Sequence, residues 1–337
     1  MRRILYIAFV RMPTEKAHGF QIMKTCEAFA AAGHAVTLVT PGRKSKLGTD
    51  PFAYYDIKRN FVLAVVRTPD FVQFGFLGFL FSVAWFSELV KWRKDFWSSI
   101  IYSRDSLVLA QYVLLGRTVV YEAHRAPTLV DRLVARRAHR MVVITESLRA
   151  EFLRAGVPPA RILVAHDAVD APPPTRSREE LGLPSGKLVV YAGSRGPGKG
   201  IETIEAALPH LKEKGVQMHL ISGKTPREAR QALAVADVVL VPNSAQNEQY
   251  GVHSSPMKLF EALASGARVV ASDAPAITQV VTDKEVWFFK ADDPDDLVHA
   301  VIEAFDDSHA QDRVVRAQEL AQRYSWDERA RIILDGL

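Results

Sequence analysis

The sequence has few features that fix a structure covalently. Cys26 is the only cysteine among 337 residues, which excludes an internal disulfide framework and suits a reducing, cytoplasmic location. Because Cys26 falls in a helical pattern, we expect a buried structural thiol. The sequence also lacks a Walker motif, a GxGxxG motif and repeats of solenoid length. It therefore supports neither an ATPase nor a dinucleotide enzyme, and it does not predict a repeat architecture.

Long apolar runs are also missing. The opening Met1–Pro13 has an apolar run that ends before Arg11, which is too short for a signal peptide and is typical of a first strand. The uninterrupted apolar part of Phe71–Trp92 has about 13 residues, whereas roughly 20 are needed to span a bilayer. This stretch is either a helix in the core of the first domain or an aromatic surface that enters a membrane interface. On the second interpretation the aromatic residues are Phe74, Phe76, Phe79, Trp85 and Phe86, and the nearby basic ones are Arg132, Arg136, Arg137 and Arg140.

The composition is that of a globular protein. Hydrophobic residues make up 48% of the chain and charged residues 24%, and the length is sufficient for two domains. The net charge is +5 and the isoelectric point is near 9.2. This balance permits anionic partners such as nucleotides, phospholipid surfaces or nucleic acid, but it selects none of them.

Strand and helix patterns alternate along the chain, with amphipathic helices such as Phe20–Ala32 and Ser147–Ala155. The expected strands are Ile4–Val10, Ala35–Thr40, Phe61–Thr68, Ser99–Ser103, Thr118–Glu122, Met141–Thr145, Ile162–Ala165, Lys187–Ala192, Gln217–Ser222, Asp237–Val241 and Arg268–Ser272. This alternation predicts parallel sheets with helices on both faces. A proline-rich break after Asp170 separates two doubly wound domains. Ligands bind at the carboxyl ends of such strands, so we expect a cleft between the domains.

The stretch HSSPMKLFEALASGARVVASD, residues 253–273, places polar residues at the start of an apolar helix. Ser255 suits the N-cap and Pro256 the first helical position. The next three amides would form an anion site, which the helix dipole and the Lys258 side chain strengthen. One turn further, Glu261 can accept hydrogen bonds from two hydroxyls, so the stretch would fit a nucleotide. The alternative is a capped helix with a solvated Lys–Glu pair.

Three further segments place polar groups at the expected strand ends. The stretch LVVYAGSRGPGKGIETIEAA runs from a strand through a glycine-rich loop into a helix, and its Arg195 and Lys199 can neutralise phosphate charge. In the first domain, His18 and Gly19 precede a helix. The strand in VVYEAH leaves Glu122 and His124 at its carboxyl end, where His124 is either structural or part of a site.

Together these segments carry a family resemblance. The chain resembles the retaining nucleotide-sugar transferases of glycosyltransferase family 4, which have the GT-B fold of two Rossmann-like domains. The resemblance runs nearly from end to end and rests on the order and spacing of EKAHGFQIMKTCEAFA, VVYEAH, MVVITESL, HDAVD, YAGSRGPGKG, ADVVLVPN, SSPMKLFEALASG and YSWDERA. It implies an acceptor-side domain at 1–170, a donor domain at 171–323, and a last helix at 324–337 that returns to the first domain.

The resemblance also implies roles for single residues. Lys199 would contact the donor diphosphate, Glu261 the ribose hydroxyls, and His124 would lie near the transferred sugar. Gly19 would line a loop beside donor and acceptor. The residues expected to be catalytic are His124, Arg195 and Lys199. Those expected to bind the donor are Gly19, His253, Ser254, Ser255, Met257, Lys258, Leu259 and Glu261.

Three departures from the family pattern affect these expectations. The family's first of two glutamates is replaced by His253, so Glu248 is the alternative contact for a sugar hydroxyl. The arginine that usually follows the loop glycine is Ser194 here, and Arg195 comes one position late. The segment 219–239 is shorter than usual, which leaves the base of the donor open.

We therefore predict transfer of a sugar from a UDP- or GDP-sugar to the hydroxyl of a glycan or lipid-linked acceptor, with retained anomeric configuration, in cell-surface glycan or glycolipid synthesis. Lys199, Arg195 and the helix amides would stabilise the leaving diphosphate, and the resemblance implies that the departing phosphate takes the acceptor's proton. No metal or other cofactor is expected, because the acidic run 291–296 is typical of a helix cap. We expect no nucleic-acid partner, and a place at the inner face of the membrane if the aromatic surface binds lipid. The alternatives are a nucleotide-sugar epimerase or a non-catalytic nucleotide- or membrane-binding protein of this fold.

Overall fold

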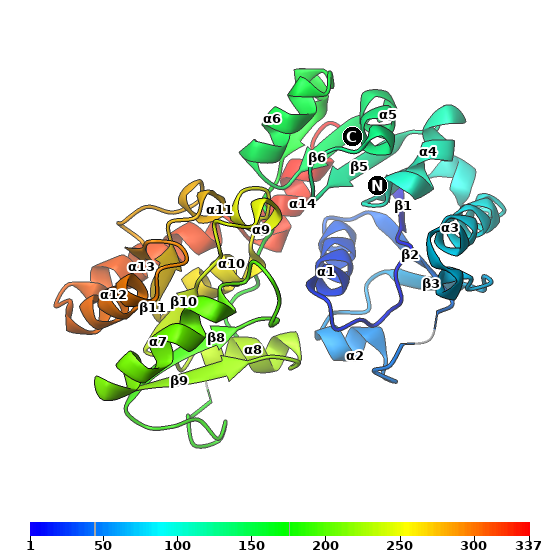
Figure 1. Cartoon of the computed structure of the whole chain (residues 1–337). Coiled ribbons are helices and arrows are strands. Elements are labelled where there is room, and N and C mark those ends of the chain that lie inside the picture. The colour runs from blue at the N-terminus through cyan, green and yellow to red at the C-terminus, as the bar shows by residue number, and fades with distance from the viewer. Residues whose placement is uncertain (44, 175) are drawn as a thin grey trace. The chain divides into compact units, whose positions relative to one another are not determined.

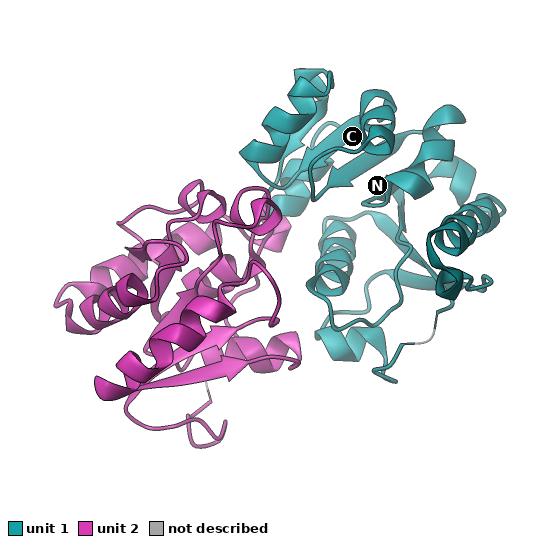
Figure 2. Cartoon of the chain, viewed as in Figure 1, with its two compact units in different colours: residues 1–165, 329–337 teal, residues 166–328 magenta. Residues whose placement is uncertain are grey.

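The chain forms two compact units (Figures 1 and 2). The computed structural model describes every residue except 44 and 175. Unit 1 comprises Met1–Ala165 and Arg329–Leu337, and unit 2 comprises His166–Glu328. Residues 166–170, expected in the first domain, lie in unit 2. They are held there because the Asp167 N–H donates to Ser255 Oγ at 2.8 Å and Val169 pairs with Ser325.

Unit 1 contains a parallel sheet of seven strands in the order β3-β2-β1-β4-β5-β6-β7. Its strands are β1 (Arg3–Ile7), β2 (Ala35–Pro41), β3 (Val62–Val66), β4 (Ile100–Ser103), β5 (Val119–Ala123), β6 (Arg140–Val143) and β7 (Ile162–Val164). The strand order reverses between β1 and β4. The carboxyl ends of these two strands therefore border the crevice where doubly wound sheets bind ligands.

Helices cover both faces of this sheet. They are α1 (Ala17–Ala31), α2 (Pro51–Tyr55), α3 (Gly75–Lys91), α4 (Ser106–Leu114), α5 (Leu129–Arg137), α6 (Glu146–Arg154) and the end of α14 (Trp326–Leu334), with 3₁₀ turns η1 (Val72–Phe74), η2 (Phe96–Ser98) and η3 (Pro159–Arg161). Leu5 and Ile7 of β1 share one core with residues of α3 to α6. Tyr6 points to the other face, where it packs against Tyr102, and the Tyr102 ring meets Phe29 of α1 edge-to-face. This two-sided burial explains why the strands read as nearly continuous apolar runs.

Unit 2 contains a sheet of five parallel strands in the order β12-β11-β10-β8-β9. Its strands are β8 (Lys187–Ala192), β9 (Val216–Ile221), β10 (Val238–Val241), β11 (Arg268–Ser272) and β12 (Trp287–Phe289). Its helices are α7 (Ile201–Glu213), α8 (Pro226–Leu233), α9 (Glu248–Gly251), α10 (Met257–Ala264), α11 (Pro275–Thr278), α12 (Pro294–Asp306) and α13 (Ala310–Gln322). Leu188 and Val190 pack with α8, α10 and α13, whereas Val189 and Tyr191 pack with α7 and α12. The order reverses between β8 and β10, so the loops after these strands border the crevice of this sheet.

The predicted fold class is confirmed, and each predicted strand has a counterpart. The strand β12 was not predicted, because its three residues are too few to show a periodic pattern. The predicted cap in the acidic run is also confirmed, because the Asp293 side chain accepts a hydrogen bond from the Asp296 N–H at the start of α12. Cys26 is a buried free thiol, as expected.

The apolar stretch in unit 1 forms η1 and α3 and has two different faces. By length and composition, Val72–Lys91, with a mean hydropathy of 1.4, meets the requirements of a membrane-spanning helix. Val83, Phe86 and Val90 lie in the core of unit 1, and Phe79 packs against it. For Phe79 and Phe86 the core interpretation is thus correct. The opposite face, which we call the α3 aromatic face, consists of the exposed Phe74, Phe76, Leu77, Phe81, Trp85 and the adjoining Trp92.

Candidate functional site

Two loops of unit 2 meet at the carboxyl ends of β8 and β10. The glycine-rich loop 193–200 follows β8, and the Ser244 N–H donates to Gly198 O at 3.3 Å to join it to the loop after β10. Gly200 has a φ of +73°, and a Cβ there would lie 1.6 Å from Pro242 O. Only glycine permits this approach of the two backbones. The close packing brings the residues of both loops into one place.

Two lysine side chains converge on this place. The Nζ atom of Lys199 lies 3.7 Å from the ring centroid of Tyr250, and that of Lys258 lies 5.3 Å from the ring centroid of Tyr191. Both distances are within the range of a cation–π interaction. Lys258 Nζ is buried and has no hydrogen-bond partner. In the part of the chain that the structure describes, neither ammonium forms an ion pair with a carboxylate.

The pKa values of the two lysines reflect this environment. Burial lowers the pKa of Lys199 to about 8. Burial, together with the charge of Lys199, lowers the pKa of Lys258 well below its ordinary value. Two partly desolvated cations without an anion are costly. A ligand with more than one negative charge would offset this cost.

The start of α10 differs in detail from the expectation. Pro256, not Ser255, is the N-cap residue. The Ser255 hydroxyl accepts a hydrogen bond from the Asp167 N–H, a group far from this helix in the sequence. The Leu259 N–H already donates to Pro256 O at 2.8 Å. The amides left without an intrahelical acceptor are those of Met257 and Lys258, so the predicted anion site at this helix is smaller than expected.

Glu261 lies one turn into α10, near a second charged group. Burial raises the pKa of its carboxyl to about 7, the positive charge of Arg230 opposes this shift, and Asp170 adds to it. Arg230 forms an ion pair with Asp170 at 2.6 Å. A carboxylate kept at the edge of ionisation in a half-buried place is typical of a site that binds polar ligands.

His253 lies in the segment between β10 and the start of α10. His253 is 4% exposed, and its Nε2 atom lies 3.4 Å from Glu248 Oε1. His253 and Glu248, the two alternative contacts for a sugar hydroxyl, therefore lie next to each other. The Ser254 hydroxyl donates to Tyr250 O at 2.8 Å and fixes the loop. That His253 contacts a transferred sugar stays a prediction. Arg195 is exposed on the glycine-rich loop.

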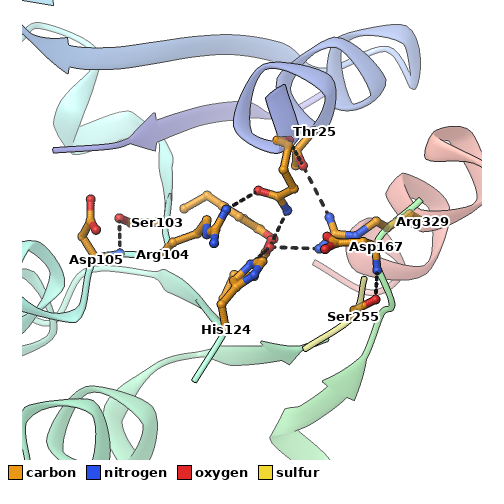
Figure 3. Close-up of polar contacts among 11 residues, drawn as sticks. Thr25, Ser103, Arg104, Asp105, His124, Asp167, Ser255 and Arg329 are labelled. Carbon is orange, nitrogen blue, oxygen red and sulfur yellow. Dashed lines mark hydrogen bonds and ion pairs between the residues drawn. The ribbon is translucent and has the colours of Figure 1, made fainter. Parts of the chain in front are cut away.

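In unit 1, His124 belongs to a buried polar network at the carboxyl ends of β4 and β5 (Figure 3). Its Nε2 atom is hydrogen-bonded to Glu122 Oε1, which also accepts from Gln21 Nε2 at 2.6 Å. Arg104 Nη1 donates to Gln21 Oε1 at 2.8 Å. Arg329 Nη2 lies 3.0 Å from Glu122 Oε1. His124 is therefore held by several side chains and is not a free surface residue.

Gly19 was expected in a loop. It lies instead in the first turn of α1. Its N–H donates to Lys16 O at 3.0 Å. A Cβ at this position would lie 2.1 Å from the Tyr55 hydroxyl oxygen and 2.5 Å from Thr14 Cγ2. The Tyr55 hydroxyl holds the preceding turn by accepting from the Thr14 N–H. Close packing therefore requires glycine here, whatever else this segment binds.

Two family models match the chain in succession. The model described as Glycosyltransferase Family 4 matches residues 20–171, and the model described as Glycosyl transferases group 1 matches residues 186–307. The chain belongs to glycosyltransferase family 4. It is thus an enzyme of the glycosyltransferase class, as predicted. No curated protein matches the sequence at a significant level.

Several solved structures resemble this family 4 chain over nearly its whole length, each at 16% identity. Sucrose-phosphate synthase from Thermosynechococcus elongatus has a TM-score of 0.74 and covers 98% of this chain and 96% of its own. HepE from Anabaena, solved in complex with UDP-glucose, has a TM-score of 0.72 and covers 100% of both chains. WaaG, a glycosyltransferase involved in lipopolysaccharide biosynthesis, has a TM-score of 0.67 and covers 99% of this chain and 100% of its own. The two parallel-sheet units and these similarities confirm the GT-B fold.

Sequence reasoning missed several residues of both sites in this glycosyltransferase. Tyr191 and Tyr250 lie against the two lysines, yet an aromatic residue in an apolar strand or a very short helix gives no signal of such a contact. Arg329 is hydrogen-bonded to Thr25, 304 positions earlier in the chain. A single arginine in a helical pattern resembles a solvated one, so its burial could not be predicted.

The lysine pair predicts proton uptake on ligand binding. At pH 8, the two lysines should take up protons when UDP or GDP binds, because the diphosphate stabilises their charged forms and raises their pKa values. Affinity should fall as the pH rises above about 8, where Lys199 loses its charge. Calorimetry in buffers of different ionisation enthalpy measures the uptake. Lys258→Met should take up fewer protons and lose about 1.5–3 kcal/mol of binding free energy.

The matched control for this experiment is Lys212→Met, which removes an exposed lysine from α7. Its affinity and proton uptake should equal those of the wild type. Binding of either nucleotide without proton uptake at pH 8 would contradict the assignment, as would equal uptake by Lys258→Met and the wild type.

Replacing Glu261 should raise the stability of the protein above pH 7 and weaken nucleotide binding. A carboxyl whose pKa is raised by folding stabilises the protein below its unfolded pKa and loses this contribution as the pH rises through about 7. Glu261→Gln should therefore be more stable than the wild type at pH 8, by about 1–3 kcal/mol, and no more stable at pH 4. The same variant should bind UDP or GDP more weakly. Melting curves and calorimetry measure both effects. A variant that is less stable at pH 8, or one with unchanged affinity, would remove Glu261 from the site.

Proposed function

We propose that this glycosyltransferase moves a sugar from a UDP- or GDP-sugar to a hydroxyl acceptor, with retention of the anomeric configuration. The observation that carries the proposal is the pair of half-buried lysines, Lys199 and Lys258, which no carboxylate neutralises in the described part of the chain. A diphosphate carries more than one negative charge and accepts charge-assisted hydrogen bonds from ammonium groups. The complex of HepE with UDP-glucose supports the same class of donor.

The reaction needs positive charge where the leaving group forms. As the bond from the sugar C1 to the diphosphate breaks, negative charge develops on the phosphate oxygens. Lys199, Lys258 and the amides at the start of α10 stabilise this charge, and Arg195 on its exposed loop adds to them. The acceptor oxygen bonds to C1 on the face that the diphosphate leaves. Its proton passes to the departing phosphate oxygen, so the products are a glycoside and a nucleoside diphosphate.

The remaining residues bind and orient the substrates. Glu261 accepts hydrogen bonds from the ribose hydroxyls, and His124 faces a hydroxyl of the transferred sugar. We further propose that the acceptor is a glycan or a lipid-linked glycan of the cell surface. The lysines and amides already provide the positive field. The proposed transfer therefore requires neither a divalent metal nor an organic cofactor.

A transfer assay tests this function. UDP- and GDP-sugars that raise the melting temperature are incubated with alkyl glycosides and polyprenyl-linked sugars. The expected result is nucleoside diphosphate released only when an acceptor is present, and a product whose anomeric proton coupling matches that of the donor. Activity should be the same in EDTA. Conversion of the donor sugar to its epimer without release of nucleotide would indicate an epimerase. Nucleotide binding without turnover would indicate a non-catalytic protein, and activity lost in EDTA and restored by Mg²⁺ or Mn²⁺ would overturn the metal-free mechanism.

We also propose that the α3 aromatic face rests on an anionic membrane surface. Phe76 and Leu77 are 72% and 77% exposed, a large apolar surface for water to cover. The helix cannot leave the sheet without losing its buried side, where the Ser82 hydroxyl accepts from the Phe71 N–H at 2.9 Å. A helix held in this way lies on a bilayer, with its aromatic side chains at the level of the headgroups.

The basic residues expected to assist this contact are not all available to lipid. Arg136 donates through Nε to Ala155 O at 2.8 Å, and Arg140 donates through Nη1 to Ile333 O at 2.8 Å. These two arginines hold segments of unit 1 together. Arg132 and Arg137 are exposed on α5, and α4 packs against both α5 and α3. Arg132 and Arg137 are the residues left to meet anionic headgroups.

Vesicle binding tests the membrane contact. The wild type should co-sediment with phosphatidylglycerol–phosphatidylcholine vesicles at low salt, and less so at high salt because exposed charges are screened. The double variant Phe76→Ser, Leu77→Ser should remain in the supernatant with unchanged nucleotide affinity. The control variant Val315→Ser, at an exposed apolar position of α13, should sediment like the wild type. A wild type that stays in solution, or a double variant that still sediments, would contradict the proposal.

A further inference from the structure

Arg329 is a buried arginine on the last helix, α14. It is 4% exposed. One guanidinium nitrogen, Nη2, lies 3.0 Å from Glu122 Oε1, and the other, Nη1, lies 3.5 Å from Thr25 Oγ1. Thr25 in turn donates to Gln21 O at 2.8 Å. The last segment of the chain thus supplies a full positive charge to the polar network of unit 1 (Figure 3).

Glu122 is the centre of this network and only accepts hydrogen bonds. Its side chain is 0% exposed. It accepts from Gln21 Nε2 at 2.6 Å and from the Tyr102 hydroxyl. Burial raises the pKa of this carboxyl, but Arg329, His124 and Arg104 together outweigh burial and hold it well below its ordinary value. Glu122 is therefore an ionised carboxylate surrounded by donors.

His124 meets this carboxylate through Nε2. Burial lowers the pKa of His124 to about 4, and the charge of Arg104 acts in the same direction. The imidazole is therefore neutral at pH 7 and carries one hydrogen. Because an ionised carboxylate can only accept, that hydrogen lies on Nε2. Nδ1 then carries a lone pair and is an acceptor.

We propose that Arg329 is a positioning residue that acts on His124 through Glu122: by keeping the carboxylate ionised, it fixes the tautomer in which His124 offers Nδ1 as an acceptor to a substrate hydroxyl. The substrate part of this inference rests on the proposed function, in which His124 faces the transferred sugar. The tautomer itself rests only on the contacts within unit 1.

A variant without Arg329 lacks one of the positive charges near Glu122. Other titratable groups face Glu122 and His124 from β1, α1, β4, the turn after β4, and α14. They are Tyr6, Cys26, Tyr102, Arg104 and Arg329. Burial raises the pKa values of Tyr6, Cys26 and Tyr102, so these groups stay neutral. Without Arg329, the buried carboxylate and its histidine bind a proton more readily. If the proton lies on Glu122, that carboxyl donates to Nε2 and the imidazole hydrogen moves to Nδ1. If it lies on His124, Nδ1 is protonated as well.

The test is the protonation state of Nδ1, measured by ¹⁵N NMR of the imidazoles in the free protein. The His124→Gln variant identifies the signal among the ten histidines. At pH 7 the wild type should show Nδ1 without hydrogen and Nε2 with it. Arg329→Met should show a hydrogen on Nδ1, and Arg329→Lys should restore the wild-type pattern. Arg331→Met, which removes an exposed arginine from the same helix, should leave the pattern unchanged.

Kinetics supply a second measurement. In Arg329→Met the kcat should fall about tenfold, the effect of losing one hydrogen bond to the substrate. The affinity for free UDP or GDP should be unchanged, and the acidic limb of the pH–rate profile should move to higher pH. A hydrogen on Nδ1 in the wild type would overturn the inference, as would an unprotonated Nδ1 in folded Arg329→Met. The wild-type spectrum decides which tautomer is present even if the Arg329→Met variant does not fold. It does so without any substrate, so a failure of the proposed function would leave this result standing.

Discussion

The candidate site of unit 2 depends on the mutual repulsion and the desolvation of two lysine side chains. Lys199 comes from the glycine-rich loop after β8, and Lys258 comes from the start of α10. Their neighbours in this place are the rings of Tyr250 and Tyr191. Aromatic rings compensate only part of the lost hydration of an ammonium group. The free protein therefore holds charge that an anionic ligand can neutralise, and in the proposed function this ligand is the diphosphate of the donor.

Each unit keeps its polar groups at the carboxyl ends of its parallel strands. In unit 2 the loops after β8 and β10 come together because Gly200 lets the backbone reach Pro242. In unit 1 the same edge of the sheet carries Arg104 after β4 and His124 after β5, with Glu122 beneath them at the end of β5. The parallel strands place these groups together, and the apolar residues on both faces hold the strands. Function and fold therefore depend on the same topology.

The sequence predicts the architecture because parallel strands are buried on both faces and appear as separate apolar runs. It predicts which lysines and carboxylates lie at strand ends, since a strand end is local in sequence. It does not predict the hydrogen-bond partners. Ser255 is a good N-cap by residue type, but its hydroxyl accepts from the Asp167 N–H, a contact between segments 88 positions apart. Arg329 and Glu122 are also far apart in the chain, so their ion pair follows only from the three-dimensional structure.

A structure of the protein with bound UDP or GDP would decide whether the lysine pair is the diphosphate site. We expect diphosphate oxygens within hydrogen-bonding distance of both Lys199 Nζ and Lys258 Nζ, and the Glu261 carboxylate hydrogen-bonded to the ribose hydroxyls. A nucleotide bound elsewhere would contradict it, as would a diphosphate that leaves either ammonium against its tyrosine ring and out of reach.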